Sequence, residues 1–188
     1  LAERPSSTVH RIIKYIPATN TTTIVAGGTR GSGLDQLSGP STLSMDDQGY
    51  LYVNDYFNDR VMRFPPNSTG GTVGTVMVQG NNFYPESYVD TNGDLYVFTP
   101  NCYCIRKYDS NGTTYTYIGG GNFPGNTNYN IGNITNIQVQ GDYLYVSDQT
   151  YTRIQKWRKN PIDPYVVVDS AGTYFAEVHG VVDNCPVV

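Results

Sequence analysis

The stretch GYLYVNDYFNDRVMRF, residues 49–64, predicts two short β-strands joined by a turn that is rich in Asn and Asp. Two related stretches follow it, GDLYVFTPNCYCIRKY at 93–108 and GDYLYVSDQTYTRIQKW at 141–157. Their equivalent valines lie 44 and 49 residues apart, at Val53, Val97 and Val146. The first stretch is therefore one copy of a repeat, and a period of this length is typical of arrays of small sheets.

Each copy divides into four strands separated by turns of Gly, Asn, Asp and Pro, and no window shows a sustained helical stripe of apolar residues. We therefore expect an all-β protein, a β-propeller built from four-stranded antiparallel blades, with about four units in a single domain that spans 1–188. The units cover approximately 40–80, 86–121 and 134–170, and a split unit combines 9–26 with 174–188.

The two chain ends supply the halves of the split unit. The N-terminal part resembles only the third and fourth strands of a copy, at 9–16 and 22–26, and the C-terminal EVHGVVDN looks like a first strand. Pairing these segments in one blade would hide two free sheet edges, which otherwise recruit partners. Because the chain begins with Leu1, we infer a processed or partial chain.

The segments GSGLDQLSGP, TLSMDDQGYLYVND and FNDRVMRF resemble the NHL repeat of β-propeller proteins. The resemblance extends over almost the whole chain and implies a propeller, most commonly one of six blades. This chain has material for four, which leaves three arrangements open: a closed four-bladed ring, an arc of a longer protein, or an arc completed by further copies of the chain. Such a resemblance implies a fold and no single function.

The resemblance also implies that the acidic residue after the second strand and the Arg that begins the third belong to the blade framework. The pairs in this chain are Asp55 with Arg60 and Asp148 with Arg153. The unit between them departs from the pattern, because Thr99 and Cys104 occupy these two positions. A pair that recurs is better explained as framework than as a catalytic group, which a protein needs only once.

Composition and charge argue against several classes of function. The formal net charge is −4 and no long basic run is present, so we expect no nucleic acid partner, RNA included. No apolar run approaches the roughly 20 residues that span a bilayer, so we expect no membrane insertion. The acidic segments 46–49 and 90–94 match tight hairpin turns and lack the downstream bidentate Glu of a calcium loop. We expect no metal site and no cofactor.

No catalytic constellation can be recognised among the titratable residues. The two histidines, His10 and His179, lie beside strands of the split unit and are too few for a catalytic zinc site with three protein ligands. The three glutamates, Glu3, Glu86 and Glu177, are poor material for a glycosidase pair. The sequence therefore predicts a protein that is not an enzyme.

The three cysteines, Cys102, Cys104 and Cys185, do not have the spacing of a zinc site. We expect one intrachain disulfide bridge, from Cys185 to one of the other two cysteines. One thiol then remains, either buried or available for a link to another chain.

Four N-x-[S/T] sequons make the chain a candidate glycoprotein, and they begin at Asn20, Asn67, Asn111 and Asn133. The first three fall in equivalent turns between the third and fourth strands of successive units, whereas the last lies in a loop between units. Because Asn is also a good turn residue, this pattern has a purely conformational alternative. The functional interpretation is N-linked glycans on the outer rim of an extracellular, secreted protein.

Together these features favour a non-enzymatic extracellular propeller that acts as a structural or binding module. Its partners would be further copies of itself, in an oligomer or filament formed through open blade edges, or other extracellular proteins. The 17 tyrosines suit such interfaces. The alternative function is a fragment of a propeller enzyme, lyase- or lactonase-like, whose metal-binding residues lie in missing blades.

Overall fold

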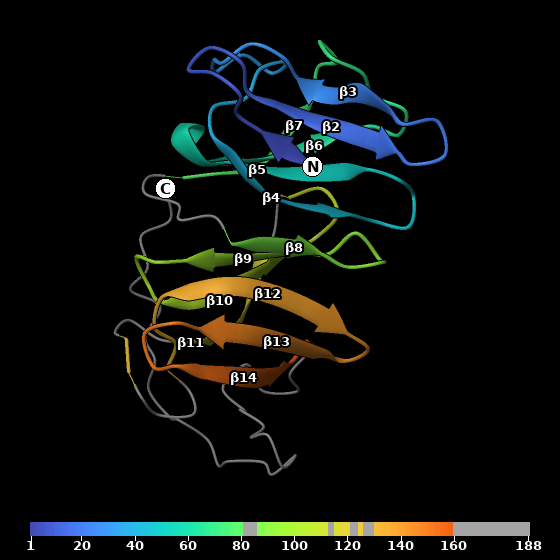
Figure 1. Cartoon of the computed structure of the whole chain (residues 1–188). Helices are drawn as coiled ribbons and strands as arrows, with labels where there is room; N and C mark the ends of the chain where they lie inside the picture. The colour runs from blue at the N-terminus through green and yellow to red at the C-terminus, as the bar shows by residue number, and fades with distance from the viewer. Residues whose placement is uncertain (81–85, 113–114, 121–123, 126–129, 160–188) are drawn as a thin grey trace. The chain divides into compact units, whose positions relative to one another are not determined.

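The computed structural model of the protein describes residues 1–80, 86–112, 115–120, 124–125 and 130–159. Within these residues the chain forms short β-strands and one turn of 3₁₀ helix, and no α-helix is present. The strands form four antiparallel sheets (Figure 1). The prediction of an all-β protein built from antiparallel sheets is therefore confirmed.

The chain divides into two compact units, and the first contains two sheets. Their strand orders are β1-β2-β3 and β4-β5-β6-β7, and a 3₁₀ turn at Tyr56–Asn58 connects β5 to β6. The bounds are β1 Ala2–Glu3, β2 Arg11–Ile16, β3 Thr21–Gly27, β4 Pro40–Met45, β5 Leu51–Asp55, β6 Arg60–Phe64 and β7 Thr75–Gln79.

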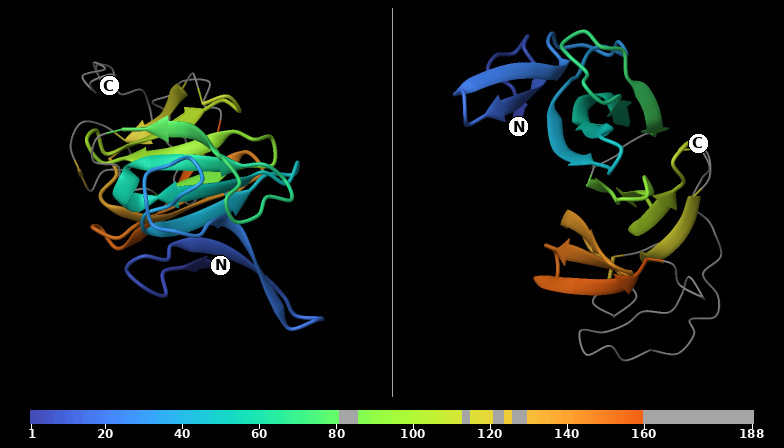
Figure 2. Two further views of the ribbon diagram at one scale, coloured as in Figure 1. Left: turned by 90° about the horizontal axis from the view of Figure 1, so that it is seen from above. Right: turned by 90° about the vertical axis from the view of Figure 1, so that its right-hand side faces the viewer.

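The second unit also contains two sheets, with strand orders β11-β10-β9-β8 and β12-β13-β14. Figure 2 shows the strands of each sheet from two further directions. The bounds are β8 Ser87–Val89, β9 Leu95–Thr99, β10 Cys104–Tyr108, β11 Tyr115–Gly120, β12 Ile134–Gln140, β13 Tyr143–Asp148 and β14 Arg153–Arg158.

The repeat appears as sheets whose consecutive strands pair in the order of the chain. The copies at 40–80 and 86–121 each form a four-stranded sheet, as β4–β7 and β8–β11. The copy at 134–170 shows three strands, and its expected fourth strand lies outside the described residues. The segment 174–188, assigned to the split unit, also lies outside them, so the number of blades stays a prediction.

The N-terminal sheet corrects the prediction that this part of the chain supplies only a third and a fourth strand. The short β1 pairs with β2 in the position of a second strand, with Ala2 opposite Ile12. The pairing is extended by Leu1, whose ammonium group donates to the Ile13 carbonyl at 2.9 Å and whose own carbonyl accepts from the Ile13 N–H at 2.8 Å. An unpaired edge leaves backbone donors and acceptors unsatisfied, and the first residues of the chain supply partners for some of them.

The core of each unit is built around the LYV motif of its second strands. Strand β9 is buried along its whole length, and β5 is buried from Tyr52 to Asp55, because both faces of these central strands are covered. The aromatic residue near the end of the third strand is buried in three copies, as Phe64, Tyr108 and Trp157. The equivalent Tyr15 is 52% exposed, because β1 pairs only with Arg11 and Ile12 and stops short of it.

Within the described residues, no helix has the length and apolar character that crossing a membrane requires.

Candidate functional site

The ion pair between Asp55 and Arg60 joins the ends of β5 and β6. The Arg60 Nε donates to Asp55 Oδ2 at 2.7 Å, and the two side chains are only 5% and 0% exposed. The remaining guanidinium nitrogens donate to backbone carbonyls of the preceding loop, from Ser32, Gly33 and Gln36, at 2.8–3.0 Å. Arg60 therefore fixes this glycine-containing loop as well as the connection between the two strands.

The pair between Asp148 and Arg153 has the same construction in the second unit. The Arg153 Nε lies 3.1 Å from Asp148 Oδ2, and another guanidinium nitrogen donates to the carbonyls of Gly125 and Asn130 at 3.0 and 2.7 Å. The Asp148 carboxylate also accepts from the N–H of Gly132 at 3.1 Å. Because a buried charge needs a partner and hydrogen bonds, both pairs are best understood as framework and not as reactive groups.

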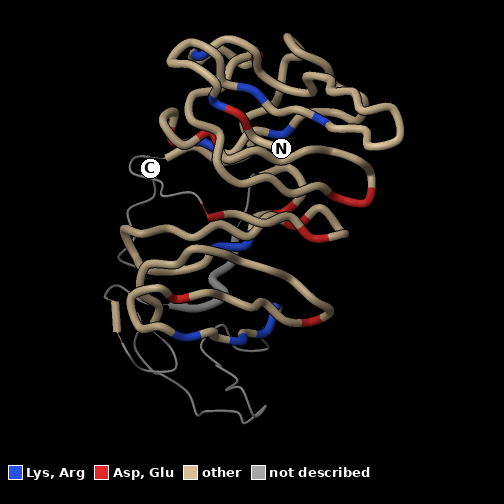
Figure 3. The backbone as a smooth tube through the Cα atoms, viewed as in Figure 1, with Lys and Arg blue, Asp and Glu red and all other residues tan. Residues whose placement is uncertain are grey.

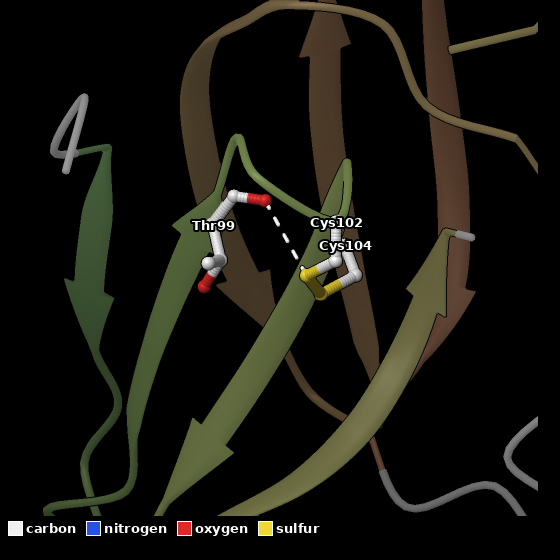
Figure 4. Close-up of a disulfide and its surroundings, with 3 residues drawn as sticks. All are labelled: Thr99, Cys102 and Cys104. Carbon is white, nitrogen blue, oxygen red and sulfur yellow. Dashed lines mark hydrogen bonds between the residues drawn. A yellow bond between two sulfur atoms is a disulfide. The ribbon is translucent and has the colours of Figure 1, made fainter. Parts of the chain in front are cut away.

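The copy between these pairs replaces the ion pair by a disulfide. Thr99 and Cys104 face each other in the β9–β10 register, where the other copies have Asp and Arg. Figure 4 shows the bond between Cys102 and Cys104, and the Cys102 Sγ lies 3.5 Å from the Thr99 carbonyl oxygen. Both cysteines are 2% exposed. In this copy a disulfide therefore stabilises the connection between the second and third strands, which an ion pair stabilises in the copies with Asp55 and Asp148.

This pairing corrects the prediction that Cys185 bridges to Cys102 or Cys104. Cys185 lies outside the described residues, and the two nearby cysteines bond to each other. Their Cα atoms are 5.2 Å apart because Tyr103 between them adopts a left-handed conformation, with φ of +45°. That distance falls within the range that disulfides require, so no partner from another part of the chain is needed.

Peptide mapping under non-reducing conditions is expected to find Cys102 linked to Cys104 and to find Cys185 alkylated. Reduction is expected to lower the free energy of unfolding by only about 1–2 kcal/mol, because the closed loop is very short in the chain-entropy account. Thermal unfolding with and without reductant measures this change, and a Cys102→Ser/Cys104→Ser variant should not respond to reductant. A peptide that links Cys185 to either of the other cysteines would contradict the assignment.

The acidic turns at 46–49 and 90–94 hold their own backbone. Asp46 Oδ1 accepts from the N–H groups of Gln48 and Tyr50 at 3.0 and 2.9 Å, and the Tyr52 hydroxyl donates to Oδ2 at 3.4 Å. Gly49 closes the turn with φ of +85°, which disfavours a side chain. The carboxylate therefore acts as a local acceptor in a hairpin turn.

Asp90 plays the same part in the turn between β8 and β9. Its Oδ1 accepts from the Asp94 N–H at 3.1 Å, and its Oδ2 accepts from the Tyr96 hydroxyl at 3.3 Å and pairs with the Lys159 ammonium group. Asp94 pairs in turn with Lys107 at 2.7 Å. Figure 3 shows the acidic residues at the turns of β4–β5 and β8–β9. The carboxylate oxygens of Asp46 and Asp90 and Oδ2 of Asp94 are therefore engaged by backbone amides, tyrosine hydroxyls or lysine ammonium groups.

His10 is buried beside the loop that Arg60 fixes. Its Nδ1 accepts a hydrogen bond from the Gly39 N–H at 2.9 Å, so this nitrogen carries no proton. Burial lowers the pKa of His10, the charges of Arg30 and Arg4 lower it further, and Asp55 opposes them. The other histidine, His179, lies outside the described residues.

The stability of the first unit is expected to fall as the pH drops below about 6.5. Unfolded His10 binds a proton more readily than folded His10, so unfolding takes up a proton in this range and becomes easier, by at most about 1.4 kcal/mol per pH unit. Urea unfolding in a Glu86→Gln background between pH 5 and 8, followed by circular dichroism, measures the slope without the opposite contribution of the Glu86 carboxyl, whose pKa folding raises. A His10→Asn variant retains an acceptor near Nδ1 and should lose most of the slope, and an unchanged slope would contradict this assignment.

Among the described carboxyl groups of the second unit, Glu86 has the most unusual surroundings. Glu86 immediately precedes β8, and its backbone carbonyl accepts a hydrogen bond from the Phe98 N–H at 3.0 Å. Glu86 therefore lies opposite Phe98, the last residue of the LYVF segment in β9. Asn136 on β12 occupies the same register position, opposite Ser147. Strands β8 and β12 contact each other, so a carboxyl and an exposed amide lie at equivalent positions of neighbouring edge strands.

The electrostatic state of Glu86 follows from its burial. Burial alone raises the pKa of Glu86 to about 7, and its side chain makes no ion pair or hydrogen bond with another described residue. A carboxyl group that is half ionised near neutral pH can both accept and donate a proton. Such perturbed groups are concentrated at functional sites, so Glu86 is the candidate functional residue of the described chain.

The sequons lie on exposed turns. Asn20 joins β2 to β3, Asn67 joins β6 to β7, and Asn111 joins β10 to β11, and all three are exposed. Asn133 is also exposed but lies at the other end of its sheet, directly before β12.

No family model matches the sequence. Among solved structures, the chain is similar to a calcium-binding protein, regucalcin, from Agrobacterium tumefaciens, with a TM-score of 0.53 and 15% identity over 82% of this chain and 53% of that one. A gluconolactonase from Xanthomonas campestris matches with a TM-score of 0.54 and 15% identity over 77% and 43% of the two chains. An inactive virginiamycin B lyase from Staphylococcus aureus, with quinupristin, matches with a TM-score of 0.52 and 11% identity over 93% and 71%.

The likeness shows a β-propeller fold. The chain spans about half the length of regucalcin and of the gluconolactonase, at 53% and 43%. The finer resemblance to the NHL repeat stays a prediction, because no family model supports it.

The comparisons contradict the prediction that the protein is not an enzyme, because the propellers that it resembles include a gluconolactonase and a lyase. That prediction relied on the lack of a recognisable catalytic set in the sequence. A single carboxyl group whose pKa is raised by burial leaves no sequence motif, so composition does not set Glu86 apart from the other two glutamates. The repeat distinguishes Glu86 from the other glutamates, because Glu86 is a carboxyl residue at a position where the other copies have Thr42 and Asn136.

The neighbours also raise the question of a metal ion. Within the part of the chain that the structure describes, no three His, Cys, Asp or Glu side chains come together. Glu86 and Asn136 offer one carboxylate and one amide, which is fewer than the six to eight oxygens that calcium takes. These residues do not complete a metal site, and no step of the reaction proposed below passes through one.

Proposed function

We propose that this chain is part of a β-propeller enzyme that hydrolyses a lactone, the ester bond of a small cyclic substrate, with Glu86 as general base. The observation that carries the proposal is the partly buried carboxyl group of Glu86, which has no ion-pair or hydrogen-bond partner among the described residues and whose pKa is raised to about 7. The substrate class is supported by the likeness of the fold to a gluconolactonase.

The proposed reaction needs one proton acceptor and one hydrogen-bond donor. Ionised Glu86 takes a proton from a water molecule while the water oxygen bonds to the carbonyl carbon of the ester. The amide of Asn136, on the neighbouring strand, donates to the carbonyl oxygen as negative charge develops there. The ring C–O bond then breaks, and the leaving alkoxide receives the proton from Glu86, which returns to its ionised form.

The raised pKa of Glu86 suits this double role. A general base with a pKa near the working pH accepts a proton in the first step and releases it in the second without a large energetic cost in either. An ordinary exposed glutamate, with a pKa near 4.3, would be a much weaker base.

The proposal is tested with the native protein as isolated, so that any further chain is present. Aliphatic γ- and δ-lactones are incubated with the protein in a pH-stat, and acid release is compared with a protein-free blank. Ring opening above the blank, with a rate that rises through pH 7, is expected. If no lactone in the series is opened faster than in the blank, the proposed reaction is wrong.

A further inference from the structure

We propose that Asn20, Asn67 and Asn111 carry N-linked glycans, and that these glycans mark the same turn of three successive sheets. Each residue joins the last two strands of its sheet, β2 to β3, β6 to β7 or β10 to β11, and is exposed. The amide nitrogen, which is the atom that would be modified, makes no hydrogen bond with a described residue at any of the three positions.

A conformational role explains only part of this pattern. Asn20 and Asn67 have φ of +50° and +60°, a left-handed conformation that Asn tolerates better than most residues. In the third turn the left-handed position belongs to Gly112, with φ of +71°, so the backbone there does not require Asn111. An Asn is present in the third turn although the turn geometry does not require it.

The hydroxyl groups of the first two sequons make no hydrogen bond with a described residue. Thr22 and Thr69 stand two residues after Asn20 and Asn67, both are exposed, and neither hydroxyl bonds to a described residue. By contrast, the neighbouring Ser68 is held by a hydrogen bond from its Oγ to the Val25 carbonyl at 2.7 Å. The acceptor Asn and the hydroxyl at the second position after it are the two features that N-glycosylation requires.

The modification is a transfer from a polyprenyl-diphosphate-linked oligosaccharide. The amide nitrogen bonds to C1 of the first sugar, the bond between C1 and the diphosphate oxygen breaks, and the amide loses one proton. The polyprenyl diphosphate leaves as an anion, so no oxidant or reductant is needed.

The placement of the Asn111 turn is compatible with catalysis by Glu86. In an antiparallel four-stranded sheet, the turn after the third strand lies at the same end as the turn after the first, and the start of the first strand lies at the opposite end. Asn111 and Glu86 belong to the same sheet and therefore lie at opposite ends of it. Asn133 directly precedes β12 and lies at the end that carries Asn136, so it is left out of the proposal.

Glycopeptide mass spectrometry of the native protein tests the proposal. Peptides with Asn20, Asn67 and Asn111 should carry hexosamine-containing mass, and release by an amidase in heavy-oxygen water should leave labelled Asp at each position. An unmodified peptide would overturn the assignment for that turn, and three unmodified peptides would overturn it altogether.

Variants secreted from eukaryotic cells separate glycosylation from effects on the turn. Thr22→Ala and Thr69→Ala keep the Asn but remove the hydroxyl, and each should remove one glycan from the mass of the protein. Thr23→Ala is the matched control for Thr22→Ala, because it alters the neighbouring exposed Thr of β3 and leaves the sequon intact. Loss of glycan in the control, or retention of full glycan mass in the other two variants, would contradict the proposal.

Discussion

Replacing Arg60 with alanine is expected to lower the free energy of unfolding by about 3–5 kcal/mol. The change removes an ion pair whose side chains are 5% and 0% exposed, and it leaves the Asp55 carboxylate buried without its cation. It also removes three hydrogen bonds to loop carbonyls at 2.8–3.0 Å. An uncompensated buried charge is among the few defects that destabilise a domain this strongly.

The ion pair near the N-terminus provides a matched control. Arg11 and Glu3 lie 3.0 Å apart, but their side chains are 32% and 28% exposed, so Arg11→Ala should cost only about 0–1 kcal/mol. Arg153→Ala should fall between the two, because Arg153 is 19% exposed. Urea unfolding followed by far-ultraviolet circular dichroism measures all three variants, and equal effects for Arg60 and Arg11 would contradict the account.

The double variant Asp55→Ala/Arg60→Ala gives a second test. It removes both charges, so it should cost clearly less than the sum of the two single changes. Hydrogen exchange of residues 29–39 should increase in Arg60→Ala, because the guanidinium no longer holds the loop carbonyls. Additive single effects and unchanged exchange would show that the pair does not fix this loop.

Replacing Glu86 with glutamine is expected to lower kcat/KM for lactone hydrolysis by about 10²–10⁴-fold. Glutamine has nearly the same shape but cannot accept the proton of water. The wild-type rate should rise with pH through about 7, where the Glu86 carboxyl ionises, and the residual rate of the variant should lack this step. Glu3→Gln is the matched control, because Glu3 lies in a partly exposed ion pair in the first unit and its replacement should leave the profile unchanged.

The stability of the same variant separates catalysis from structure. Folding raises the pKa of Glu86, so the ionised side chain destabilises the folded state, and this cost grows as the pH rises from about 4.5 to about 7. Glu86→Gln should therefore be at least as stable as the wild type at pH 8. If Glu86→Gln is less stable than the wild type at pH 8, its loss of activity is explained by unfolding, and the assignment of Glu86 as the base is contradicted.

Local signals in the sequence predicted the sheets well. These signals are the repeated LYV segments, the Gly of each first turn and the aromatic residue near the end of each third strand. Each signal depends on only a few neighbouring residues, and the strands form where these signals predict them. The pairs formed by Asp55 with Arg60 and by Asp148 with Arg153 were also visible, because each pair stands five residues apart in a repeated motif.

Other features depend on segments that meet only after folding. The pairing of β1 with β2 involves two residues at the end of the chain, too few to produce a pattern. The bond between Cys102 and Cys104 depends on the left-handed conformation of Tyr103, and the spacing of the cysteines alone did not indicate it. The sequence therefore predicted a bridge but assigned it to the wrong pair.

The sequence by itself determined the repeat, the strand boundaries within a few residues and the identity of the framework pairs, because these follow from short-range periodicity and turn chemistry. The tertiary structure decided which polar groups are desolvated. Arg60 reaches carbonyls 24 to 28 residues earlier in the chain, and Glu86 acquires its raised pKa only when folding buries it. Desolvation depends on everything packed around a group, and for this reason the candidate base was not apparent until the strands were in place.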